Sequence, residues 1–200
     1  YMLQATRQAV QDLLDTSFGY HILQLGVSGA EPLCLGSPIN HRVYCAPKPG
    51  QGVGLLADPD ELPLESDSVD AIIAHHCLEF APNPHQILRE IQRVLTSQGQ
   101  LLVIGFNTFS LLGCNTRARA IMGEPLWANH RPITEHRLSD WLHLLNCEVL
   151  ETRRIYALPP VGRGGVRRML ERCDHWTAQH NVPIGGIYIT HATKKVAGLN

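Results

Sequence analysis

The sequence has neither a long hydrophobic run nor clustered cysteines, and both absences limit what the protein can be. No apolar run in its 200 residues approaches the roughly 18 to 20 that cross a bilayer, and residues 1–15 lack the basic start and long apolar stretch of a secretory signal. The six cysteines include no CxxC pair. We therefore expect a soluble, cytoplasmic protein with reduced core thiols, and neither a disulfide framework nor a metal site.

Charge is also sparse, since 18% of the residues are charged and 44% are hydrophobic. This balance predicts a folded globular chain, and the length predicts one domain over residues 1–200. The net charge of -1 is unevenly distributed: residues 1–100 hold 5 basic and 11 acidic side chains, whereas residues 101–200 hold 12 and 7. The arginine-rich stretch 153–172 either binds an anionic acceptor or partner or is an exposed helix face. The near-neutral total favours the exposed face and argues against nucleic acid.

Strand-like apolar runs alternate with helical-period stretches along the whole chain, a pattern typical of α/β proteins. We expect strands at 21–27, 42–46, 54–57, 69–74, 101–106, 148–155 and 187–192, and helices at 2–15, 84–95, 135–145 and 165–175. The helix at 84–95 has the clearest start, because Asn83 can cap it and Pro84 suits its first position. Residues 107–132 show no clean period, and we expect them to cover a ligand site.

Polar and glycine residues follow several of the predicted strands. In an open parallel sheet ligands bind beyond the carboxyl ends of the strands, so these positions are the candidate site. A glycine-containing loop follows the first strand, an acidic stretch the third, His75 and His76 the fourth, and Asn107 the fifth. Adjacent residues on a strand point to opposite faces, which argues against one metal ion held by both histidines. Asn107 either reaches the pocket or forms a turn.

Together these residues resemble the class I S-adenosylmethionine-dependent methyltransferases, in particular the small bacterial branch similar to the ubiquinone and menaquinone biosynthesis enzymes. That family has an Asp, a Leu-Pro pair, D-x-S-F-D, an apolar strand, H-V-L-E-H and R-V-L-K-P-G-G. The corresponding segments here are Asp58, residues 62–63, 67–70, 76–80 and 93–99. The resemblance implies a Rossmann-like methyltransferase fold with a mostly parallel seven-stranded sheet and helices on both faces.

The resemblance also implies S-adenosylmethionine as cofactor, S-adenosylhomocysteine as product and a small-molecule acceptor. It assigns a role to each matching residue at the strand ends. The cofactor loop holds Gly26, Ser28 and Gly29; Asp58 and Pro59 lie near the adenine; Ala74 and His75 line the methionine end; His76 faces the acceptor; and Asn107 is on the acceptor side. If that acceptor is a hydroxyl or phenol, His76 or His75 can take its proton, and His76 is the candidate catalytic base. The alternative is a histidine that only packs and hydrogen-bonds at the strand end. The stretch 107–132 would then be a cover or acceptor-side insertion.

Four departures from the family pattern weaken the cofactor motif. Gln24 replaces the acid of the first motif, Ser28 and Ala30 replace its second and third glycines, and the second strand with its following proline, residues 42–47, has no carboxylate for the ribose hydroxyls. Losing a charged hydrogen bond costs roughly 1.5 to 3 kcal/mol, which weakens binding without abolishing it. Two interpretations stay open here: an active methyltransferase, or a degenerate fold kept as a binding or scaffold module. A nicotinamide dehydrogenase is disfavoured, because the loop lacks a full GxGxxG.

Overall fold

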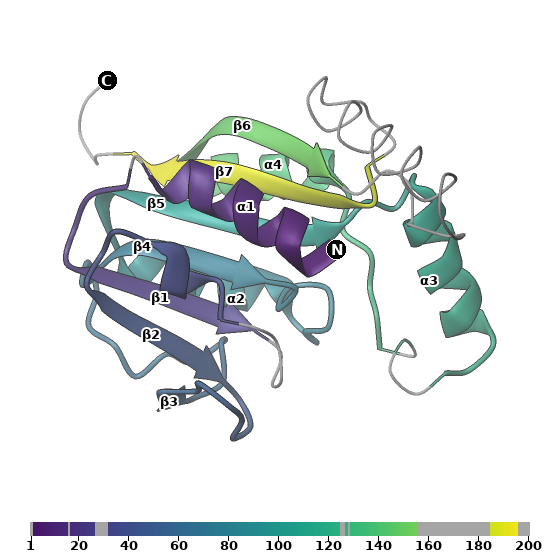
Figure 1. The fold of residues 1–200 in the computed structure, drawn as a ribbon, viewed down its shortest axis with the longest axis horizontal. Helices are drawn as coiled ribbons and strands as arrows, with labels where there is room; N and C mark the ends of the chain where they lie inside the picture. Colours follow the sequence, from purple (N-terminus) through teal and green to yellow (C-terminus); the bar gives the residue numbers. More distant parts are fainter. Residues whose placement is uncertain are drawn as a thin grey trace.

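The computed structural model describes residues 2–15, 17–26, 32–124, 127, 129–155 and 185–195. In this part of the chain, seven strands form one sheet in the order β3-β2-β1-β4-β5-β7-β6 (Figure 1). Their bounds are β1 His21–Gly26, β2 His41–Ala46, β3 Leu55–Leu56, β4 Val69–His75, β5 Leu95–Phe106, β6 Cys147–Ile155 and β7 Ile187–Lys194. All pairs from β3 to β5 are parallel, whereas β7 runs antiparallel to both β5 and β6. The predicted Rossmann-like fold is present, and its sheet is mixed.

Helices cover both faces of the sheet, as the sequence predicts. The described helices are α1 (Met2–Leu14), α2 (Pro84–Val94), α3 (Leu111–Ile121) and α4 (Glu135–Leu144), with a short 3₁₀ turn at Cys34–Gly36. Figure 1 shows α1 on one face and α2 and α4 on the other. The apolar stripe of α1 packs in one core cluster, and those of α2 and α4 pack in a second. Each face of the sheet is therefore removed from water by its own core.

Side-chain caps begin the two predicted helices that the sequence marks most clearly. Asn83 Oδ1 accepts a hydrogen bond from the Gln86 amide at 3.3 Å, and Pro84 occupies the start of α2. Thr134 Oγ1 accepts from the Arg137 amide at 3.3 Å and begins α4. Each cap satisfies one of the amides that a helix start leaves without a partner.

Helix α3 is the element that the sequence analysis missed within residues 107–132. Ser110 caps it, since its hydroxyl oxygen accepts from the Gly113 amide at 2.9 Å. The helix lacks a strong apolar stripe, and Ile121 and Met122 at its end are 87% and 70% exposed. Hydrophobic periodicity therefore gave no signal, and the serine cap was the only sequence mark. The predicted helix at 165–175 lies outside the described residues, and no helix in the described part is long and apolar enough to cross a membrane.

Gln24, which replaces the family's acid on β1, is a fully buried structural residue. Its side-chain oxygen accepts hydrogen bonds from the amides of Leu33 at 2.6 Å and Cys34 at 3.0 Å. A neutral amide supplies this acceptor without burying a charge, which is costly in a core. The departure from the family pattern thus anchors the chain where it returns from the glycine loop to the 3₁₀ turn.

We expect Gln24→Ala to lower the free energy of unfolding by about 2 to 6 kcal/mol, because it leaves two buried amides without an acceptor at about 1 to 3 kcal/mol each. Urea denaturation followed by circular dichroism measures this loss. Gln51→Ala in an exposed turn is the matched control, with an expected change within about 0.5 kcal/mol. Equal midpoints for the two variants would show that Gln24 has no anchoring role.

Candidate functional site

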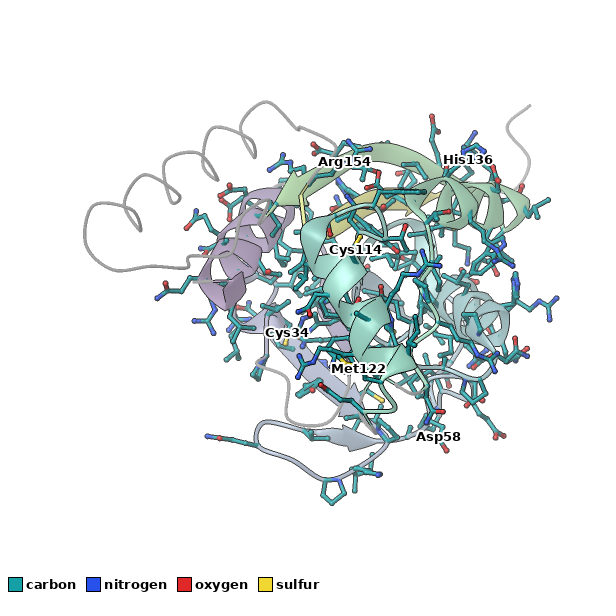
Figure 2. All side chains as sticks on the ribbon, turned by 90° about the vertical axis from the view of Figure 1, so that its right-hand side faces the viewer. Cys34, Asp58, Cys114, Met122, His136 and Arg154 are labelled. Atoms are coloured by element: carbon teal, nitrogen blue, oxygen red, sulfur yellow. The ribbon has the colours of Figure 1, made fainter. Side chains whose placement is uncertain are left out.

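The carboxyl ends of β1, β4 and β5 meet at one edge of the sheet, and helix α3 lies across this edge. Figure 2 faces it, with Cys114 and Met122 on α3 in front, Asp58 below, and Arg154 and His136 above. Two cavities open here. The first, of about 410 Å³, lies at the ends of β1 and β4 and is called the β1–β4 cavity; the second, of about 530 Å³, lies beyond β5 and β6 and is called the β5–β6 cavity.

The β1–β4 cavity gathers three of the residues predicted to bind a cofactor. Its described lining is Gly26, Pro47, Asp58, Pro59, Asp60, Cys77, Phe80, Ala81, Pro82, Asn83 and Ile87. The predicted Gly26, Asp58 and Pro59 are among them, whereas Ser28 and Gly29 lie outside the described residues. Asp60 is a lining residue that the sequence analysis missed, because an acid in a polar loop is usually solvated surface. Burial raises the pKa of the Cys77 thiol to about 12, so it stays protonated.

Gly26 ends β1 close to a neighbouring side chain. A Cβ atom at this position would lie 3.1 Å from the ring of Tyr44 on β2, which is fully buried. Glycine therefore avoids a tight contact with the tyrosine at the edge of the β1–β4 cavity.

Ala74 and His75 end β4, but they occupy different surroundings. Ala74 is fully buried in the core cluster that contains α2. His75 is 5% exposed, and its Nδ1 atom has no hydrogen-bond partner. Burial, and then the neighbouring His76, lowers the pKa of His75 to about 3, although Glu79 opposes the shift. His75 is therefore neutral near neutral pH and offers a polar ring to the site.

His76 contradicts the prediction that the two adjacent histidines point to opposite faces. Its φ of 52° lies in the left-handed region, because β4 has ended and the chain turns away from the sheet. Alternation holds only within a strand, so the rings of His75 and His76 lie side by side with centroids 4.9 Å apart. The ring of His76 also stacks on Phe106 at the end of β5, at a centroid distance of 4.1 Å and 20° between planes.

Glu79 is a buried carboxylate beneath these rings, with a side chain only 2% exposed. Its Oε1 accepts from the Phe106 amide at 2.6 Å, and its Oε2 lies 2.9 Å from Nδ1 of His76. The Nε2 atom of His130 lies 3.8 Å from Oε1, within ion-pair range but beyond a hydrogen bond. Burial by itself raises the pKa of Glu79, but the two imidazoles and the amide outweigh it and hold the pKa below its usual value. The carboxylate is therefore ionised.

Aromatic rings surround this carboxylate on the side of residues 107–132, the predicted cover. Phe106 lies 5.7 Å from Trp127 and 5.7 Å from His130 between ring centroids, and Phe80 lies 5.2 Å from His130. Trp127 Nε1 and His130 Nε2 are buried without a hydrogen-bond partner. Sequence spacing gave no signal for this cluster, because its members come from three separate segments.

The β5–β6 cavity holds the predicted Asn107, which proves to be a tether as well as a lining residue. Its side-chain nitrogen donates to the Gly185 carbonyl at 2.8 Å, and its side-chain oxygen accepts from the Phe109 amide at 3.1 Å. Asn107 therefore forms the predicted turn and also lines this cavity. The described lining is Asn107, Thr108, Phe109, Ile133, Thr134, Glu135, His136, Arg154 and Tyr188. Gly105 on β5 is required beside it, since a Cβ atom there would lie 2.4 Å from the Tyr188 hydroxyl oxygen.

Buried polar atoms without a partner gather at this edge of the sheet. Among the described side chains they are His75 Nδ1, Thr108 Oγ1, Trp127 Nε1 and His130 Nε2. Buried polar groups in proteins are nearly always hydrogen-bonded, so a cluster of exceptions marks a place where a polar ligand can supply the partner.

The arginine-rich stretch is described only at its start. Arg153 pairs with Glu151 at 2.9 Å on β6, and Arg154 pairs with Glu135 at the start of α4. The remaining arginines lie outside the described residues. Both described guanidiniums are thus paired within the fold.

Residues 39–103 match the family model of a methyltransferase domain. The chain is also 36% identical over 148 residues to the uncharacterized protein YafS of Escherichia coli (strain K12). That alignment covers 74% of this chain and 61% of YafS, so the chain spans less than two thirds of this relative's length.

Solved structures with the same fold include two described as methyltransferases. One is an S-adenosylmethionine-dependent methyltransferase of Thermotoga maritima, described as a possible histamine N-methyltransferase, with a TM-score of 0.66, 21% identity, and coverage of 96% of this chain and 89% of that one. Another is a putative methyltransferase of Bacillus halodurans, with a TM-score of 0.63, 14% identity, and coverage of 94% and 98%. At these identities the likeness establishes the fold.

We expect stability to fall as the pH drops from about 6.5 towards 5, partly because of His75. Its pKa is lowered to about 3 in the folded state, so in this range the unfolded chain binds a proton that the folded chain does not, and acid favours unfolding. His75→Gln removes this contribution, and the slope of unfolding free energy against pH should decrease by about 1.4 kcal/mol per pH unit. Urea denaturation of both proteins at several pH values measures the slopes. Parallel slopes would contradict a neutral, buried His75.

Proposed function

We propose, from the premise that this chain has the fold of the class I S-adenosylmethionine-dependent methyltransferases and contains their methyltransferase domain, that it transfers a methyl group to a small-molecule acceptor. The cofactor implied by this family is S-adenosylmethionine. The observation that carries the proposal is the β1–β4 cavity, because it lies at the strand ends where ligands bind in such sheets and unites Gly26, Asp58 and Pro59. The ubiquinone-like branch stays a prediction.

The residues of the β1–β4 cavity fit this cofactor. Its volume of about 410 Å³ falls in the range of small-ligand sites, roughly 300 to 1,000 Å³. Among its described lining residues, Asp58 and Asp60 are acidic and none is basic, which suits a ligand with a sulfonium and an ammonium group. Phe80 and Pro59 add apolar surface for a flat base. Asp60 lines the same cavity as Asp58, and we assign to it the binding of the ribose hydroxyls, a role for which β2 offers no carboxylate.

S-adenosylmethionine supplies a methyl group already attached to a good leaving group. The protein then needs chiefly to align the acceptor with that group, and alignment can contribute roughly 7 to 11 kcal/mol. In our proposal the β5–β6 cavity, Asn107 and the α3 cover hold the acceptor beside the strand ends. Residues 107–132 act as the acceptor-side part of a single domain.

His76 is our proposed catalytic base for an acceptor that must lose a proton. A base works best when its pKa lies near the working pH, and the pKa of about 3 makes His75 too weak for this task. His76 lies beside it and is held by Phe106 and Glu79. A hydroxyl or phenol is the acceptor class that needs such a base, whereas a neutral amine already carries a free electron pair.

A non-catalytic binding or scaffold module is the second candidate. It is motivated by Gln24 and by the absence of a carboxylate on the described β2, both of which depart from the cofactor motif. The anchoring role of Gln24 weakens this argument, because Gln24 stabilises the fold and is not among the described lining residues of the β1–β4 cavity.

Calorimetric titration with S-adenosylmethionine and S-adenosylhomocysteine, with NAD as control, separates the two candidates. We expect micromolar binding of both adenosyl ligands and none of NAD. Asp58→Ala should weaken that binding about tenfold or more, the effect of losing one hydrogen bond to a charged group. Glu61→Ala, in the same loop but outside the described cavity lining, is the control and should leave the affinity unchanged. Failure of the wild-type protein to bind up to millimolar ligand would favour the scaffold.

Methyl transfer from labelled S-adenosylmethionine to phenols and to the anilines of the same ring tests the acceptor class. We expect transfer to phenols, and His76→Gln should reduce its rate by about 10² to 10⁴-fold. The cofactor affinity of this variant should match the wild-type value, because His76 lies outside the described lining of the β1–β4 cavity. Transfer to anilines alone, or an undiminished rate in the variant, would contradict the proposed base.

A further inference from the structure

We infer that Glu79 is a positioning residue that fixes the tautomer and orientation of His76, so that Nε2 of His76 is left free to take the acceptor's proton. This inference rests on the proposed function of His76 as a base. It assigns a role to a buried carboxylate that is not among the described lining residues of either cavity.

The tautomer follows from what each atom can donate. An ionised carboxylate only accepts hydrogen bonds. Since Glu79 Oε2 lies 2.9 Å from Nδ1 of His76, the hydrogen must be on Nδ1. In the neutral ring Nε2 then carries the free electron pair. The same pairing orients the base in a Ser-His-Asp triad.

The ring plane is fixed by two further contacts. The His76 imidazole stacks on Phe106 with 20° between the planes, and the Phe106 amide itself donates to Glu79 Oε1 at 2.6 Å. These contacts fix the positions of the Glu79 carboxylate, the His76 imidazole and the Phe106 ring relative to one another. A base held in one orientation loses less freedom when the acceptor binds.

The charge of Glu79 also faces the proton that His76 would accept. The carboxylate is almost completely buried, so water screens its attraction to an imidazolium only weakly. The other described titratable groups facing this pair are His130, at 3.8 Å from the other oxygen, His75, whose ring adjoins His76, and Cys77 and Tyr188, which interact electrostatically with Glu79. A proton arriving on Nε2 of His76 therefore meets a ready counter-charge.

The transfer step balances with these groups alone and the cofactor of the proposed function. The acceptor's O–H bond breaks and its proton moves to Nε2 of His76. The oxygen–methyl bond forms as the methyl–sulfur bond breaks, and the electron pair of that bond stays on the leaving sulfur. Glu79 stays ionised throughout and stabilises the imidazolium.

Nitrogen-15 NMR of the histidine rings tests the inference without any acceptor. The resonances of His76 are assigned by their loss in His76→Gln. Above the pKa of His76, the wild-type protein should show its Nδ1–H tautomer. In Glu79→Gln the amide oxygen keeps the Phe106 amide and the NH₂ group faces His76, so we expect the Nε2–H tautomer.

Glu90→Gln is the matched control, because Glu90 pairs with Arg93 on α2. It should leave the tautomer of His76 unchanged. An Nε2–H tautomer in the wild-type protein overturns the inference even if Glu79→Gln does not fold. An unchanged tautomer in folded Glu79→Gln overturns it as well. Loss of cofactor binding by the wild-type protein, with these NMR results as expected, would instead refute the proposed function alone.

Discussion

The buried carboxylate of Glu79 is the constraint on which the carboxyl edge of the sheet depends. It joins the turn after β4 to the end of β5 through Phe106, and the Glu79 carbonyl accepts the Arg131 amide at 2.7 Å from the segment between α3 and α4. A buried charge is stable only when paired and hydrogen-bonded, so every neighbour that satisfies it is held in place. The same requirement brings the histidines, the end of β5 and the cover together, and thereby shapes the candidate site.

Gln24 performs the corresponding task on the other side of β4, with a neutral group. Its oxygen holds two amides of the chain that returns from the glycine loop. At Glu79 the facing groups include imidazoles, which gain from a negative charge. The Gln24 oxygen accepts from two backbone amides, for which a neutral acceptor suffices without the cost of burying a charge. Polarity at each strand end is thus matched to its local partners.

Much of the fold was accessible from the sequence because burial imposes a period. The buried parts of β1, β4 and β5 are mainly apolar runs, and α2 has both an apolar stripe and a visible cap at Asn83. Helix α3 was missed because its end is exposed and its cap is a single serine. The reversed direction of β7 was also hidden, since pairing direction leaves no mark in a buried apolar strand.

Some residues of the candidate site were likewise predictable from the strand pattern, whereas others depend on tertiary packing. Gly26 ends β1, and Asp58 and Pro59 lie shortly after β3, so the sheet itself brings them to one cavity. The arrangement of His75, His76 and Glu79 depends instead on a left-handed turn at one residue, where strand alternation stops. The partner of a side chain beyond such a turn is set by tertiary packing, here by Phe106 from β5 and His130 from the cover. A strand pattern can therefore locate the edge where chemistry occurs, whereas the assignment of donor, acceptor and base requires the packed structure.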